Sequence, residues 1–160
     1  MNIYLHKQKS LTLAEILIAV CILIVAVSAI LMAYANCFIL IDSVRNVNIA
    51  TNAAQGVIEE IRNTAFTRLT DPSYCDCVTS LCNGCTFTVN EIPQSMGVIY
   101  IDETTPELLG VTVSVCWRQK GRTIGEDSNL NGILDAGEDT NVNGRIDSTV
   151  ELTTKVANRF

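Results

Sequence analysis

The residues best suited to chemistry in this chain form an acidic repeat with a period of twelve residues. The first copy runs from Asp127 to Glu138, and the second begins at Asp139. Both copies carry oxygen-bearing side chains at positions 1, 3, 5 and 9 and a glycine at position 6, a pattern that predicts calcium-binding loops. Hard oxygen donors without soft ligands favour calcium over transition metals. The candidate metal ligands are Asp127, Asn129, Asn131, Ile133, Asp135, Glu138, Asp139, Asn141, Asn143, Arg145 and Asp147, with Ile133 and Arg145 standing at the backbone-carbonyl position.

The two copies differ at position 12. The first ends with Glu138, whereas the second has Val150 at the equivalent position and Glu151 one residue later. The second site is therefore either incomplete or shares Glu138 or Asp135, and we expect one or two calcium ions. The segment resembles the tandem calcium loops of dockerin and thrombospondin type, because no extended helices flank it. The alternative is an acidic, disordered loop, which this composition would otherwise indicate.

Cysteines form a second candidate group, and four of the seven fall within eleven residues. Their C-x-C and C-x-x-C spacings fit either a four-thiolate zinc knuckle or two disulfides. We favour disulfides because this part of the chain is expected outside the cytosol. A redox-active C-x-x-C would require a thioredoxin-like context that the sequence lacks. The disulfide candidates are Cys75, Cys77, Cys82, Cys85 and Cys116, and one of them is expected to stay free.

Charge and composition argue against an enzyme and against nucleic-acid binding. The 160-residue chain has a formal net charge of -6, and this acidity disfavours nucleic acid as a partner. Its one histidine, His6, lies within the first ten residues. A chain that loses those residues has no imidazole for a catalytic base or a metal site. No catalytic residue is predicted.

A long apolar segment must position these groups. From Ile16 to Ile41 there are 26 residues without a charge, more than the roughly 20 that a helix needs to cross a bilayer. Because Lys7 and Lys9 precede the segment, the positive-inside rule places residues 42–160 outside the cytoplasm. A signal peptide is the alternative, since Ala33-Tyr34-Ala35 offers a cleavage site, but the apolar run is longer than usual for one.

The remaining periodicities predict an α+β fold. Apolar residues at helical spacing continue the apolar segment to Ala65 as one long amphipathic helix, with its second half covered on one face by a sheet. Trp117 and the valines before it share one face of a strand and are predicted to be core. That strand is expected to pair antiparallel with the last one. Strands are predicted at 86–92, 98–102, 109–118 and 149–156.

The start of the chain carries a further motif. The string Lys9-Ser10-Leu11-Thr12-Leu13-Ala14-Glu15 resembles the processing site of type IV prepilins and type II secretion pseudopilins, a basic leader followed by a Thr-Leu-x-Glu run and an apolar helix. The resemblance implies that a prepilin peptidase cuts between Ser10 and Leu11 and methylates the new amine. Glu15 becomes the fifth mature residue, and its carboxylate needs a partner in lipid. Ser10 and Leu11 stand where glycine and phenylalanine are commonest in the family.

The resemblance implies a structural subunit, a minor pilin or pseudopilin of a type IV pilus or a type II secretion filament, and the acidic repeat predicts that calcium stabilises it. The implied partners are other subunits in a helical filament, a prepilin peptidase and the inner-membrane assembly machinery. The subunit would cross the inner membrane once, with its C-terminal domain periplasmic or extracellular. The alternative is a membrane-anchored, calcium-dependent binding module that does not polymerise. The expected parts are a leader (1–10), a helix (11–66, transmembrane to about 41) and a β-rich domain (67–160) with a cysteine loop (75–85) and a calcium-loop insert (126–148).

Overall fold

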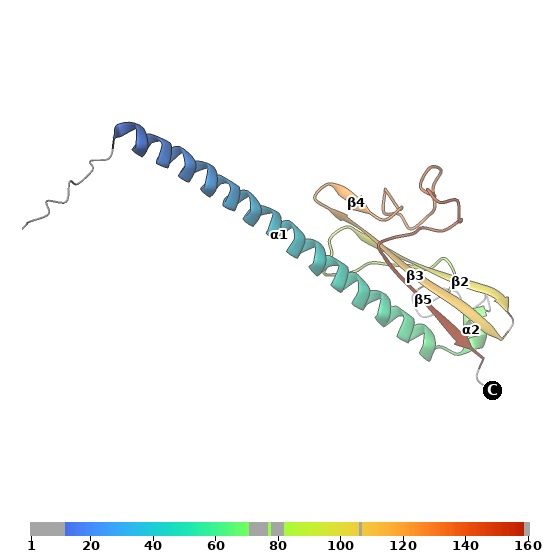
Figure 1. Cartoon of the computed structure of the whole chain (residues 1–160). Helices are drawn as coiled ribbons and strands as arrows, with labels where there is room; N and C mark the ends of the chain where they lie inside the picture. Colours follow the sequence, from blue (N-terminus) through green and yellow to red (C-terminus); the bar gives the residue numbers. More distant parts are fainter. Residues whose placement is uncertain (1–11, 71–76, 78–81, 106, 159–160) are drawn as a thin grey trace, which may run out of the picture. The chain divides into compact units, whose positions relative to one another are not determined.

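The computed structural model describes residues 12–70, 77, 82–105 and 107–158. These residues have the predicted α+β architecture, with two helices followed by five strands (Figure 1). The chain divides into two compact units, Met1–Asp42 and Ser43–Phe160, and the first helix contributes to both. The elements are α1 (Leu13–Asn63), α2 (Phe66–Thr70), β1 (Thr86–Phe87), β2 (Ser95–Thr105), β3 (Leu108–Gln119), β4 (Arg122–Ile124) and β5 (Val150–Ala157).

The described part of the first unit is an apolar helix. Leu13 is 81% exposed and Val25 69%, and the charge-free stretch from Ile16 to Ile41 is exposed throughout. Among the described residues, α1 alone is long and apolar enough to cross a membrane, a property that an N-terminal signal sequence shares. An exposed apolar surface of this length requires a non-aqueous environment, supplied by lipid or by other apolar helices.

The second unit is built on an antiparallel sheet, with the part of α1 from Ser43 onward lying along it (Figure 1). The sheet order is β1-β2-β3, and both β4 and β5 pair with the remaining edge of β3. The predicted pairing of the third and last strands is confirmed. Val113 lies opposite Leu152, and Val115 lies opposite Val150. This register directs the apolar residues of both strands to the same face.

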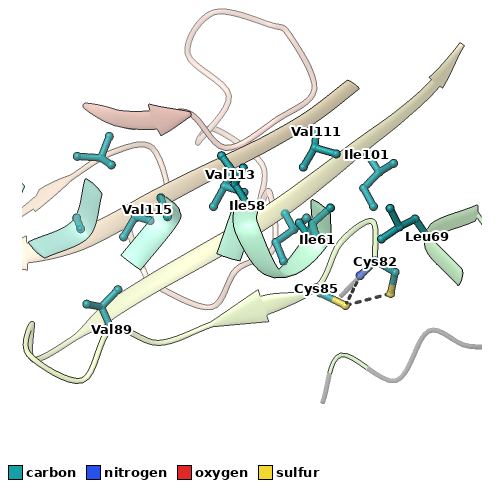
Figure 2. Close-up of a cluster of buried hydrophobic side chains, with 14 of the residues drawn as sticks. Ile58, Ile61, Leu69, Cys82, Cys85, Val89, Ile101, Val111, Val113 and Val115 are labelled. Atoms are coloured by element: carbon teal, nitrogen blue, oxygen red, sulfur yellow. Dashed lines mark hydrogen bonds between the residues drawn. The ribbon is translucent and has the colours of Figure 1, made fainter. Parts of the chain in front are cut away.

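The main core lies between α1 and the sheet. Ala50, Ala54, Ile58 and Ile61 recur at spacings of four, four and three and are the buried residues of α1. This spacing places them on one helical face, and the two alanines allow a close approach to the sheet. Figure 2 shows Ile58 and Ile61 among the strand valines. Trp117 is 1% exposed, so its predicted core position is confirmed.

The sheet has a second buried face. All seven residues from Val111 to Trp117 are buried, although alternate residues of a strand point to opposite faces. On the face away from α1, Cys116 packs with Val98 and Ile146. Tyr100, Leu130 and Leu134 complete this second cluster. Because Leu130, Leu134 and Ile146 belong to the segment between β4 and β5, this insert (126–148) covers the second face of the sheet.

Several boundaries differ from those predicted. The segment 88–92 turns instead of continuing β1, because the backbone N–H of Val89 donates to Ser95 Oγ at 2.9 Å and that of Ile92 to the Val89 carbonyl at 3.0 Å. Val89 and Ile92 are nevertheless buried, so these apolar residues belong to the core although they lie outside the strands. The long helix ends at Asn63, and α2 then places Leu69 in the core.

The packing of the insert against the sheet gives a first prediction. Ile146 is 1% exposed, whereas Ile133, in the same insert, is 63% exposed. We expect Ile146→Ala to lower the free energy of unfolding by about 2–4 kcal/mol, because it leaves a cavity in the second cluster. The matched variant Ile133→Ala should change it by less than about 0.5 kcal/mol.

The measurement is urea unfolding of the full chain in detergent, followed by the fluorescence of Trp117, the sole tryptophan of the sequence. Equal stabilities of the two alanine variants would mean that the insert does not pack on the sheet.

Candidate functional site

The first acidic repeat forms a compact loop around Asp127, whose side chain is fully buried. Its carboxylate accepts hydrogen bonds from the backbone N–H groups of Asn131 (3.1 Å) and Gly132 (2.8 Å). Oδ2 of Asp135 accepts hydrogen bonds from the side-chain amides of Asn129 (2.7 Å) and Asn131 (2.9 Å). The candidate ligands at positions 1, 3, 5 and 9 therefore belong to one connected network.

Glu138, at position 12, ties the two ends of this first loop together. Its Oε1 accepts hydrogen bonds from the backbone N–H (2.8 Å) and the hydroxyl (2.5 Å) of Ser128, and its Oε2 accepts one from the N–H of Asp135 (3.1 Å). These hydrogen bonds, that of the Ser128 hydroxyl foremost, hold the pKa of Glu138 below its usual value. The carboxylate is therefore ionised at neutral pH, the form in which it would bind a cation.

The second repeat has the same internal geometry. The Asp139 carboxylate accepts hydrogen bonds from the backbone N–H groups of Asn143 (3.0 Å) and Gly144 (2.8 Å). Oδ2 of Asp147 accepts hydrogen bonds from the side-chain amides of Asn141 and Asn143. These contacts match those of the first loop residue for residue, twelve positions later. The predicted repeat is thus also a repeat in structure.

The backbone conformations repeat as well. Gly132 and Gly144, at position 6, have φ angles of 76° and 75°, in the left-handed region that favours glycine. Leu130 and Val142, at position 4, have φ angles of 59° and 60°, which side chains with a Cβ rarely adopt. Because the same uncommon conformations recur twelve residues apart, the two loops follow the same backbone path.

The second loop is closed by Glu126, which precedes the first loop. Its Oε1 accepts hydrogen bonds from the backbone N–H (3.1 Å) and the hydroxyl of Thr140, and its Oε2 accepts one from the N–H of Asp147 (3.1 Å). Thr140 and Asp147 occupy positions 2 and 9 of the second loop. Glu138 binds the same two positions in the first loop. Glu126 thus takes the place of the acid that the second repeat lacks at position 12. Glu138 and Asp135, the two residues that the sequence suggested for sharing, do not.

Glu126 is not among the ligands that the sequence pattern predicts, although a signal for it exists. The twelve-residue period extends upstream of the predicted loops, from Gly125-Glu126 to Gly137-Glu138. Both of these glycines have positive φ angles, 105° and 93°. Glu126 is therefore the counterpart of Glu138 in an extended repeat, and extending the alignment of the two copies by two residues would have identified it.

The donors of the two loops fit a hard cation. All of the predicted side-chain ligands offer oxygen, and the segment from Glu126 to Glu151 contains seven acidic residues against one basic residue, Arg145. Burial, together with the negative charge of Asp147, raises the pKa of Glu151 above its usual value. Asp127, Asn129, Asn131, Asp135, Glu138 and the Ile133 carbonyl would hold a first ion; Asp139, Asn141, Asn143, Asp147 and the Arg145 carbonyl would belong to a second.

The cysteine cluster contains a disulfide. Cys77 and Cys85 are bonded, with their Cα atoms 5.2 Å apart, and Cys82 is also disulfide-bonded. The Sγ atom of Cys82 lies 3.0 Å from that of Cys85. The Cys77–Cys85 bond takes two of the thiolates that a zinc knuckle would need, which supports the disulfide interpretation. Cys75 lies outside the described residues, and Cys116 is a free, buried thiol.

The predicted processing residues Ser10 and Leu11 lie outside the described residues. The structure begins with Thr12, which caps α1 together with Glu15. Oε2 of Glu15 accepts hydrogen bonds from the backbone N–H (2.9 Å) and the hydroxyl (3.0 Å) of Thr12. The N–H of Glu15 in turn donates to Thr12 Oγ1 at 3.3 Å. This is a capping box, so Glu15 also has a local role at the start of the helix.

No family model matches the sequence, and no curated protein or solved structure is significantly similar to it. The architecture itself is pilin-like: a long, apolar N-terminal helix whose later residues pack against an antiparallel sheet.

The cysteines give a second prediction. With Cys21 and Cys37 replaced by serine in the full chain, we expect a maleimide at neutral pH to leave Cys116 unmodified until denaturant is added. Burial of the Cys116 side chain, which is 1% exposed, raises the pKa of its thiol and blocks access to it. Intact mass before and after denaturation measures the labelling.

Peptide mapping of the same sample without reductant should recover the Cys77–Cys85 disulfide. Alkylation of Cys77 and Cys85 without reductant, together with stoichiometric zinc, would instead establish the zinc knuckle.

Proposed function

We propose that this protein is a structural subunit, a minor pilin or pseudopilin, of a type IV pilus or a type II secretion filament. One observation carries the proposal: a single helix, α1, supplies both an exposed apolar stretch and the buried residues of a β-sheet domain. A simple membrane anchor has no need to continue into the core of the domain that it anchors. In a filament, the same helix would join a domain on the surface to the helices packed inside.

The proposal includes the maturation of the chain. A prepilin peptidase removes residues 1–10 by cutting between Ser10 and Leu11, and it methylates the new amine. The subunit then waits in the inner membrane, with its β-domain on the periplasmic side, until the assembly machinery extracts it into the filament. The role is architectural, and no catalytic step is assigned to it.

Glu15 is the residue that we assign to assembly. In the isolated subunit its carboxylate is bound by Thr12, which satisfies hydrogen bonds but supplies no positive charge. An ionised carboxylate at the edge of the hydrocarbon region is unfavourable unless a cation approaches it. In the filament, the amine of Leu11 from a neighbouring subunit would supply this cation, so that only one packing register pairs the two charges.

The role of Glu15 in assembly can be tested separately from its role in capping the helix, which gives a third prediction. Glu15→Gln removes the charge, but glutamine retains an oxygen that can cap Thr12. We expect this variant to enter filaments at least tenfold less efficiently than wild type, with its helix content unchanged. Thr12→Ala keeps the charge and loses the cap hydroxyl, so it should assemble nearly normally. Immunoblots of sheared filaments and circular dichroism of the purified subunits measure the two quantities.

Normal assembly of Glu15→Gln together with failure of Thr12→Ala would assign Glu15 to capping only. If the wild-type chain were processed but never recovered in a filament, the alternative function, a membrane-anchored, calcium-dependent binding module, would replace the proposal.

We further propose that calcium stabilises the insert. Asp127 is fully buried, and the hydrogen bonds that its carboxylate accepts come from the neutral N–H groups of Asn131 and Gly132. A buried carboxylate is costly unless a cation offsets its charge. Because the insert joins β4 to β5, a bound ion would also hold the last strand in place. Extracellular loops of this kind bind calcium with dissociation constants of about 10⁻⁴–10⁻³ M, which would couple folding to export.

A fourth prediction follows for the full chain in detergent. Calcium at a hundredfold excess over its dissociation constant should stabilise the fold by about 2.7 kcal/mol and raise the midpoint of thermal unfolding by roughly 10 °C. Magnesium at the same concentration should have little effect, because it requires a stricter octahedral geometry. Differential scanning calorimetry with calcium, magnesium or chelator makes the comparison.

The matched variants are Asp127→Ala and Glu103→Ala, since both remove one carboxylate and Glu103 is exposed on β2, outside the insert. The calcium response should vanish in the first and persist in the second. An absent response in wild type, or one that Asp127→Ala leaves intact, would refute calcium binding at the insert.

A further inference from the structure

Two glutamates in the insert connect its two loops. Glu138, which immediately precedes the second loop, binds positions 2 and 9 of the first, Ser128 and Asp135. Glu126, which immediately precedes the first loop, binds positions 2 and 9 of the second, Thr140 and Asp147. We propose that the insert is one unit whose two loops open together. Glu138, the last residue of the first loop, closes that loop and is bonded to the second, whereas Glu126, bonded to the first loop, closes the second.

The contacts of Glu126 place it at the base of the insert. Its backbone N–H donates to the Asp147 carbonyl at 2.8 Å, and the Asp147 N–H donates back to Glu126 Oε2 at 3.1 Å. Asp147 lies only three residues before β5, and Glu126 only two residues after β4. Glu126 thus joins the start of the insert to its end as well as closing the second loop.

The covalent bonds of the two glutamates explain why the loops would open together. Glu126 is bonded covalently to Asp127, the buried first residue of the first loop, and Glu138 is bonded to Asp139, the first residue of the second. If the second loop opens, Glu126 loses its partners and the entry to the first loop is released. If the first loop opens, Glu138 is freed and the entry to the second is released. If the second loop were closed by a glutamate at its own end, as the first is by Glu138, its opening would leave the entry to the first loop intact.

This inference goes beyond the proposed function, because all of the contacts are between protein groups and none requires an ion. It also assigns a task to Glu126, a residue that the calcium-loop pattern leaves out. The prediction, the fifth, is that the loss of a glutamate is felt most strongly in the loop that it does not precede.

The test is amide hydrogen exchange of the full chain in detergent, resolved by residue, for Glu126→Ala, Glu138→Ala and the double variant. Glu126→Ala should accelerate exchange at Thr140 and Asp147 by roughly tenfold, because the N–H group of each loses its charge-assisted hydrogen bond to the carboxylate, with a smaller increase at Ser128 and Asp135. Glu138→Ala should show the reverse order. The increase in the double variant should fall short of the product of the two single effects, since one unit opens only once.

The milder variant Thr140→Ala, which removes a hydroxyl that donates to Glu126, should reproduce part of the Glu126→Ala effect without the risk of unfolding. Glu91→Ala, at an exposed position outside the insert, controls for the loss of a surface carboxylate. Exchange is recorded both in calcium and in chelator. If calcium does not bind, the exchange increases in the two loops are compared in chelator.

The proposal is overturned if Glu126→Ala accelerates exchange in the first loop more than in the second, if the single effects multiply in the double variant, or if wild-type Thr140 and Asp147 are unprotected in both conditions.

Discussion

The placement of the apolar half of α1 is the constraint on which the rest of the structure depends. Twenty-six consecutive residues without a charge, all exposed, form an apolar surface that is compatible with a single-pass membrane anchor or a signal sequence. These exposed residues do not contribute to the core of the β-domain. It uses the later turns of the same helix, where small and branched side chains face the sheet and polar residues separate them.

A helix covers only one face of a sheet, and the other face must also be accounted for. β3 is the central strand, and seven of its consecutive residues are buried, which requires a second layer. The insert between β4 and β5 provides that layer through Ile146, Leu130 and Leu134. The hydrogen-bonded acidic loops therefore have a structural role of their own, because the insert that they form packs over Cys116 and Val98 and buries them.

Much of this arrangement was predictable from local patterns. Helical and alternating spacings predicted the α+β class, the pairing of β3 with β5 and the buried position of Trp117, because the spacing of apolar residues shows which face of a helix or strand is buried. The burial of Thr112 and Ser114 was not predictable, since their polar side chains alternate along β3 with the apolar core residues. The closing role of Glu126 was missed because the alignment of the two copies began at Asp127, and its partners Thr140 and Asp147 follow it by 14 and 21 residues. The twelve-residue period identified the two loops but not the hydrogen bonds by which Glu126 joins them.

The central claim, that α1 belongs to a processed filament subunit, is tested most directly by the mature N-terminus. Intact mass and N-terminal sequencing of protein purified from membranes of the native host decide it. The account predicts a chain that begins at Leu11 with an N-methyl group and retains Glu15 and the whole of α1. A chain that begins at Asn36, after cleavage by a signal peptidase, would contradict it, because more than twenty residues of the helix would then be absent from the mature protein.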